Sequence, residues 1–127
     1  MSPAEDAQLL LGLVRRHLRS LRFSLDPAYP DEDWGFTAQQ AVEKLIKAWI
    51  VLADRRPPRV HDLEELMVLA GLELDPRLLA LQVFAVEARY GEGPFSLPAP
   101  RQDVLALVEA ELDRCERRVQ ELGPSFS

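Results

Sequence analysis

Hydrophobic residues recur along most of this chain at the three- and four-residue spacing of amphipathic helices. Between residues 105 and 122 the apolar side chains advance in steps of 3, 4, 3, 4 and 3, the spacing of a seam between packed helices. Similar stripes begin near residues 3 and 31. The pattern predicts five helices and almost no strand, with the helices over residues 3–21, 31–55, 62–70, 76–90 and 101–122.

Capping residues and prolines mark several of the expected boundaries. Ser2 precedes Pro3, and Asp75 precedes Pro76, so each pair combines a side-chain cap with a proline in the first helical turn. The consecutive prolines at positions 57 and 58 interrupt the helical pattern between the second and third helices. These signals predict sharp helix starts at residues 3 and 76.

The short connections between the helices predict how the helices pack. Neighbouring helices joined by short loops usually run antiparallel. We therefore expect an all-α fold, an antiparallel four-helix up-and-down bundle with one additional short helix. We also expect the two long helices over residues 31–55 and 101–122 to run antiparallel. A length of 127 residues is typical of one domain, which we expect to span residues 1–127.

Composition narrows the class of protein. Hydrophobic residues make up 47% and charged residues 28% of the chain, an ordinary globular balance, and no stretch reaches the ~20 apolar residues of a membrane span. The acidic N-terminus differs from a signal peptide, and the single Cys115 excludes an internal disulfide. We expect a cytoplasmic protein without membrane contact. One cysteine and two histidines are few ligands for zinc, so we expect neither a metal nor a cofactor.

Charge is unevenly distributed along the chain. The formal net charge of −6 argues against nucleic-acid binding driven by the overall field. The first helix nevertheless carries a cluster of arginines, and Arg favours planar contacts with phosphate or carboxylate. We interpret this cluster as a solvated face that pairs with acidic neighbours. Its members are Arg15, Arg16, Arg19 and Arg22.

The run over residues 48–53 is apolar on every side of its helix. Such a segment belongs at the centre of a bundle or in a contact with another chain. Together with the wide apolar stripes of the last two helices, it leads us to expect a homodimer.

Several sequence elements, in their order and spacing, resemble the HEPN domains. The resemblance extends over residues 4–122. It rests on Ala-Gln-Gln-Ala-Val-Glu-Lys at 38–44, Lys-Ala at 47–48, His-Asp-Leu at 61–63 with Leu66, and Ala-Arg-Tyr at 88–90. HEPN domains are small helical bundles, often encoded beside a minimal nucleotidyltransferase. The resemblance implies a non-catalytic module that binds a nucleotide, a minimal nucleotidyltransferase partner, or both, within a system such as a toxin–antitoxin pair.

The resemblance also implies which residues contact the ligand. Positive side chains at positions 44, 47 and 89 would meet phosphates, and the tyrosine at position 90 would stack on a base. An ordinary surface with salt bridges and a packed tyrosine is the alternative interpretation. The candidate ligand-binding residues are Gln40, Glu43, Lys44, Lys47, Arg89 and Tyr90.

The alternative function is a metal-independent ribonuclease toxin. Many HEPN nucleases carry an Arg-x4–6-His motif late in the chain, but no histidine follows Arg89 here. The spacing occurs once elsewhere, from Arg56 (or its neighbour Arg55) to His61. Histidine could transfer the proton and arginine could stabilise the phosphate charge, with the first-helix arginines holding RNA. Because two prolines stiffen the intervening chain, we expect no cleavage that depends on His61.

Overall fold

The computed structural model describes residues 2–91 and 93–123, except for the side chain of Arg89. Within these residues every regular element is helical, which confirms the expected all-α class. The elements are α1 (Pro3–Phe23), α2 (Asp31–Leu52), α3 (Leu63–Ala70), α4 (Pro76–Leu79), the 3-10 helix η1 (Ala80–Phe84), α5 (Glu87–Tyr90) and α6 (Arg101–Leu122).

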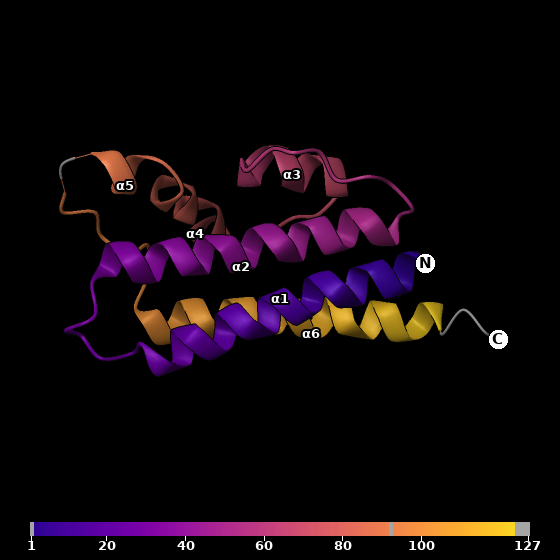
Figure 1. Cartoon of the computed structure of the whole chain (residues 1–127), viewed down its shortest axis with the longest axis horizontal. Helices are drawn as coiled ribbons and strands as arrows, with labels where there is room; N and C mark the ends of the chain where they lie inside the picture. Colours follow the sequence, from indigo (N-terminus) through magenta and orange to yellow (C-terminus); the bar gives the residue numbers. More distant parts are fainter. Residues whose placement is uncertain (1, 92, 124–127) are drawn as a thin grey trace.

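The three long helices lie side by side, and α3 and α5 lie along the side of α2 that faces away from α1 (Figure 1). Helices α1 and α6 pack on one side of α2, and α3 and α5 lie on the other. The 3-10 helix η1 packs on α2, and α4 also contacts α6. The expected four-helix bundle is thus replaced, in the described residues, by three long helices and an arm of short ones.

The long helices do not all have the expected directions. The indole nitrogen of Trp34 donates a hydrogen bond to the carbonyl of Leu21 at 3.2 Å, so the start of α2 lies beside the end of α1. Ion pairs join Arg15 to Glu116 and Arg22 to Glu109, so α1 and α6 are also antiparallel. Two helices that both oppose α1 must be parallel to each other (Figure 1). The expectation that α2 and α6 run antiparallel was wrong.

The expectation of one helix over residues 76–90 was also wrong, because this segment is divided into α4, η1 and α5. Its buried side chains Leu78, Leu81 and Phe84 recur every three residues, which is the period of a 3-10 helix. Phe84 lies so close to α2 that a Cβ atom at Gly35 would stand 2.5 Å from its ring. Packing this ring against a glycine therefore outweighs continuous α-helical winding.

Side-chain caps account for the starts of α1, α3 and α4. The Ser2 side chain accepts from the backbone of Glu5, and Asp75 accepts from the backbone of Arg77, as expected of helix caps. Helix α2 ends at Leu52 and does not reach residue 55 as expected. Asp54 adopts φ 59°, a left-handed conformation that ends a helix and releases the chain into the proline segment.

Arg101 organises the connector between α1 and α2. Its guanidinium donates to the carbonyls of Ser24 and Tyr29 and pairs with Asp31 at 2.8 Å. It also lies 5.7 Å from the centre of the Trp34 ring. The start of α6 is thereby joined to the start of α2, and Asp31 serves the fold through this ion pair.

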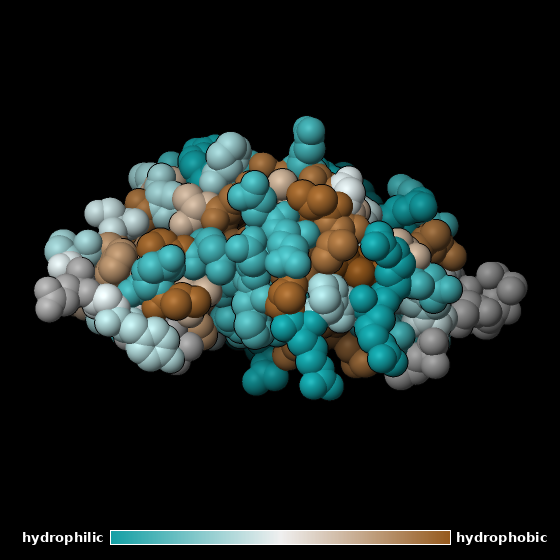
Figure 2. Space-filling view, turned by 90° about the horizontal axis from the view of Figure 1, so that it is seen from above, coloured by the Kyte–Doolittle hydropathy of each residue, from teal (hydrophilic) through white to brown (hydrophobic). Residues whose placement is uncertain are grey.

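The apolar run over residues 48–53 is largely covered inside one chain. Ala48 and Ile50 are buried, Trp49, Val51 and Leu52 are half-buried, and only the terminal alanine is exposed. Hydrophilic residues interrupt the hydrophobic ones on the face that carries α3 (Figure 2). The homodimer therefore stays a prediction without support from this run. In the described part of the chain, no helix combines the length and apolarity needed to cross a membrane.

Candidate functional site

A fully buried carboxylate lies at the centre of the most highly connected polar cluster. The Glu43 side chain, on α2, is 0% exposed, and its oxygens face four partners. Lys47 and Lys44 approach at 3.2 and 3.4 Å, and the Gln39 amide donates at 3.3 Å. The Nδ1 atom of His61 lies 3.1 Å from both carboxylate oxygens. These five residues are called the Glu43 cluster below.

The helical spacing of α2 assembles most of this cluster. Residues 39, 43 and 47 follow one another at intervals of four, which places them on one side of the helix. Lys44 stands at the margin of that side, 25% exposed, and Lys47 is 12% exposed. These are the chain's only two lysines, and both ammonium groups contact the same carboxylate.

The segment after α2 delivers His61 to the cluster. It leaves the end of α2, turns back along the outside of that helix and enters α3 (Figure 1). The His61 side chain is 70% exposed although its Nδ1 lies on the buried carboxylate. The two ring nitrogens point outward in different directions, so with Nδ1 on Glu43 the Nε2 atom does not face the carboxylate.

Opposing effects determine the pKa of Glu43. Burial favours the neutral acid, but the hydrogen bond from His61 and the charges of Lys47 and Lys44 favour the carboxylate more. The pKa of Glu43 therefore lies below its ordinary value. The two lysines outnumber the single carboxylate, so the cluster carries a net positive charge whether or not His61 is charged. Such a set of donors suits an anionic ligand.

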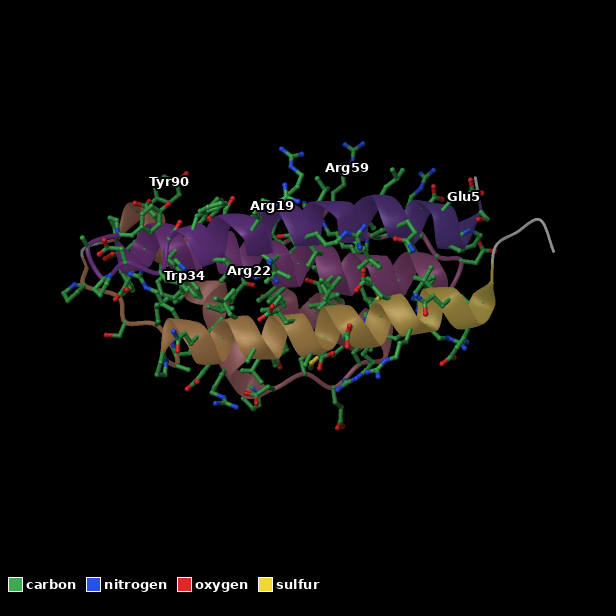
Figure 3. All side chains as sticks on the ribbon, turned by 90° about the horizontal axis from the view of Figure 1, so that it is seen from below. Glu5, Arg19, Arg22, Trp34, Arg59 and Tyr90 are labelled. Atoms are coloured by element: carbon green, nitrogen blue, oxygen red, sulfur yellow. The ribbon has the colours of Figure 1, made fainter. Side chains whose placement is uncertain are left out.

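The structure brings some of the predicted ligand residues together and separates others. Glu43, Lys44 and Lys47 meet directly, and the Gln40 amide reaches the cluster by donating to the Gln39 oxygen at 2.8 Å. Tyr90 does not join them. It is 80% exposed on α5, beside the N-terminal end of α2 (Figures 1 and 3).

Contacts on either side of Tyr90 fix its position. Phe84 packs on Gly35, and a Cβ at Gly93 would stand 3.2 Å from Glu32. The start of α2 is thus the neighbour of this part of the arm, roughly 12 Å along the helix axis from the Glu43 cluster. Arg89 has its backbone in the same short helix, and its side chain lies outside the described residues. A stacking role for Tyr90 at the cluster is not supported by this geometry.

Arg56 is likewise directed to a different place from His61. It lines a surface hollow between the start of α1 and the end of α2, together with Pro3, Asp6 and Val51. In the part of the chain that the structure describes, Arg56 has no hydrogen bond or ion pair with His61. The two residues of the Arg-x4-His spacing therefore have different surroundings, and His61 has a carboxylate partner instead.

The arginines of α1 divide into two groups. Arg15 and Arg22 pair with α6, at 2.6 and 2.7 Å, as the interpretation of a salt-bridged face predicted. Arg16 and Arg19 are exposed and have no ion pair among the described residues, and the same holds for Arg59 in the segment before His61. Arg22 points toward α6, whereas Arg19 and Arg59 lie on the side away from it (Figure 3).

The pKa of His17, on α1, is affected by neighbouring positive charges. Its pKa is lowered first by burial and then by the charges of Lys44 and Arg16. His17 on α1 therefore lies close enough to Lys44 on α2 for its pKa to be affected by that charge.

Sequence reasoning missed two residues of the site. Gln39 is 0% exposed and contacts both Glu43 and His61, although only its neighbour Gln40 was predicted. Its four-residue interval before Glu43 was the available signal. Gln82 of η1 accepts a hydrogen bond from the backbone of Leu63 at 2.8 Å, and nothing in its local sequence indicates this contact.

Comparison with family models decides the relationship of the chain. The model of the HEPN domain matches residues 15–117, a segment that includes the whole Glu43 cluster. The chain belongs to the HEPN domain family. Comparisons of this HEPN chain with curated proteins and with solved structures gave no match. The family places the protein among helical domains with nucleotide- or RNA-related functions.

Proposed function

We propose that this HEPN domain is a non-catalytic module that binds the phosphates of a nucleotide at the Glu43 cluster. One observation carries the proposal. A buried carboxylate gathers both lysines of the chain and an exposed histidine at one point on the surface. Glu43 would act as the anchor that holds these donors in place, and the ligand would be bound from the solvent side.

The donor set matches the chemistry of a phosphate group. Ammonium groups and a protonated imidazole make short, charge-assisted hydrogen bonds to phosphate oxygens. Lys44 is 25% exposed and His61 is 70% exposed, so a ligand can approach both without opening the helices. Lys47 is more enclosed and supplies charge at short range. The exposed Arg16 and Arg59 extend the positive field beyond one phosphate, which favours a nucleotide with several phosphates.

The presence of only two lysines makes the proposal directly measurable. Reductive ¹³C-methylation would label Lys44 and Lys47 besides the terminal amine, and methylation preserves the charge. Addition of ATP or inorganic triphosphate should shift both lysine signals, and adenosine should not. Lys44→Gln should weaken triphosphate binding about tenfold, the effect of one charge-assisted hydrogen bond.

Arg118→Gln is the matched control for this experiment. It removes one exposed positive charge from an ion pair with Glu121 on α6, remote from the Glu43 cluster. Its triphosphate affinity should equal that of the wild type. Equal weakening by both substitutions would indicate a general charge effect, and lysine signals that do not respond to triphosphate would reject the proposed site.

Partner binding is the second part of the proposal and is supported by family membership alone. We propose a homodimer and a minimal nucleotidyltransferase partner, as in a toxin–antitoxin pair. Sedimentation at tens of micromolar tests the homodimer, and a monomer there would contradict it. Co-expression with a small nucleotidyltransferase encoded by a neighbouring gene tests the partner, and the expected result is co-purification.

The ribonuclease alternative is favoured by one feature, the carboxylate behind an exposed histidine. A His whose Nδ1 faces a carboxylate can exchange a proton at Nε2. The separate surroundings of Arg56 argue against it, because that nuclease motif needs both side chains at one phosphate. The expected result is that purified protein and its His61→Ala variant show the same rate of RNA cleavage. A rate at least a hundredfold lower in a folded variant would support the nuclease.

A further inference from the structure

The residues His61, Asp62 and Leu63 are held by side chains from two distant parts of the chain. On one side, Nε2 of Gln39 donates to the carbonyl of His61 at 3.3 Å. On the other, Oε1 of Gln82 accepts from the backbone N–H of Leu63 at 2.8 Å. Gln39 belongs to α2 and Gln82 to η1, so the two elements that flank this segment each contribute one amide.

We infer that Gln39 and Gln82 are positioning residues of the Glu43 cluster, which hold the backbone around Asp62 so that the His61 ring stays on Glu43 with Nε2 outward. The presentation of Nε2 to a phosphate rests on the proposed function. The holding of the ring does not, because it concerns contacts within the chain.

Both the amide nitrogen and the oxygen of Gln39 take part in hydrogen bonds at this site. Its amide nitrogen donates to both Glu43 and the His61 carbonyl, and its oxygen accepts from Gln40. The side chain is 0% exposed, so water does not replace these partners. One buried amide thus connects the carboxylate to the backbone of the residue whose ring contacts that carboxylate.

Gln82 completes the N-terminus of α3. The first backbone N–H groups of a helix lack partners within the helix. Asp62 accepts from Glu65 at 2.9 Å, and Gln82 accepts from Leu63, which is fully buried. The backbone after His61 is therefore held by η1. One hydrogen bond, from Leu63 to Gln82, connects η1 with the proposed ligand site.

The sharpest test replaces Gln82, because it is less buried than Gln39 and its loss leaves the Glu43 contacts intact. Gln82→Met keeps the size of the side chain and removes the acceptor, whereas Gln82→Glu keeps an oxygen for the Leu63 N–H. Gln120→Met, an exposed position on α6, is the control. With only two histidines in the chain, a His17→Gln background assigns the ring signals of His61.

The ¹⁵N signals of the His61 ring report its position. In the wild type without ligand, the neutral ring should carry its proton on Nδ1, where Glu43 accepts it. With triphosphate bound, the imidazolium should donate from Nδ1 to Glu43 and from Nε2 to a phosphate oxygen. In Gln82→Met the ring should leave Glu43, and the other tautomer should appear in the absence of ligand. Triphosphate affinity should fall roughly tenfold, because Glu43 no longer holds the imidazolium with its Nε2–H toward the phosphate. Gln82→Glu and Gln120→Met should match the wild type in both respects.

The outcomes separate this inference from the proposed function. A Gln82→Met protein that is less stable but keeps the wild-type ring signals would overturn the positioning role. The same result in Gln39→Met would overturn it for that residue. A wild type that binds no triphosphate would reject the proposed function, while the tautomer of His61 would still decide whether the glutamines position the ring.

Discussion

Two groups of ion pairs in this protein use the same chemistry in different surroundings. In the Glu43 cluster the carboxylate is 0% exposed and faces two lysines and His61. Between α1 and α6, Arg15 and Arg22 pair with Glu116 and Glu109, and every one of these side chains is 33% to 51% exposed. The surface pairs are shorter, at 2.6 and 2.7 Å, than the buried contacts at 3.1 to 3.4 Å.

The comparison teaches that distance alone does not rank these interactions. Water already satisfies an exposed carboxylate, so pairing it with arginine adds little to stability. A buried carboxylate has no water to replace its partners. If either the carboxylate or its positive partners are removed by mutation, the remaining buried charge is uncompensated. The longer contacts of Glu43 should therefore matter more to the fold than the shorter ones of the α1–α6 seam.

The largest effect is expected from neutralising the buried carboxylate. Glu43→Gln keeps the size of the side chain but leaves Lys47, only 12% exposed, without its counter-charge. The free energy of unfolding in urea should fall by about 3 to 5 kcal/mol. The matched variant Glu116→Gln on α6 should lose about 0 to 1 kcal/mol. Similar losses in the two variants would remove the distinction between the two regions.

Acid should produce the next largest difference. Because the folded-state pKa of Glu43 lies below the ordinary 4.5, its ionised contacts stabilise the protein above pH 4.5. That contribution is lost as pH falls through the lower folded-state pKa. The free energy of unfolding should therefore fall more steeply below pH 4.5 in the wild type than in Glu43→Gln.

A background variant isolates this effect. Asp75 also has a lowered pKa, about 2, chiefly because the Arg77 side chain donates hydrogen bonds to it. Both measurements should therefore be repeated with Asp75→Asn, which removes that second acid-sensitive group. If the free energy of unfolding then falls with the same slope with and without Glu43→Gln, Glu43 does not have the lowered pKa that its contacts indicate.

The smallest effect is expected at the seam between α1 and α6. A double-mutant cycle with Arg15→Ala and Glu116→Ala should give a coupling free energy of roughly 0.2 to 1 kcal/mol. One molar salt should reduce it further, because exposed charges are screened over a few ångströms. A coupling above about 2 kcal/mol, or one insensitive to salt, would show that exposure does not separate the two groups of pairs.

Much of the fold follows from local patterns. Seam spacing and capping residues predicted α1 and α6 closely, and Gly71 ends α3 in the left-handed conformation that favours glycine. The error at residues 76–90 had no local signal that could have prevented it. Apolar residues at 78, 81 and 84 also fit a 3.6-residue period, so only the packing of Phe84 on Gly35 distinguishes the two windings.

Part of the site could also be predicted. The four-residue interval from Glu43 to Lys47 places both on one side of a helix, and this pair was identified from the sequence. His61 was identified as well, but with Arg56 as its partner. The positions of Arg56 and His61 relative to each other depend on how the segment after α2 returns along that helix. No short spacing in the sequence describes this path.

The sequence by itself therefore determined what depends on neighbours within a few residues, namely helices, their caps and the donors that one face of α2 presents. Tertiary structure alone decided that Glu43 is buried, that His61 meets it and that Gln82 holds the intervening backbone. The physical reason is that burial and long-range contact are set by how helices pack. A carboxylate that looks like a surface residue along the chain becomes the buried centre of a site when the segment before α3 packs on α2 and places His61 on it.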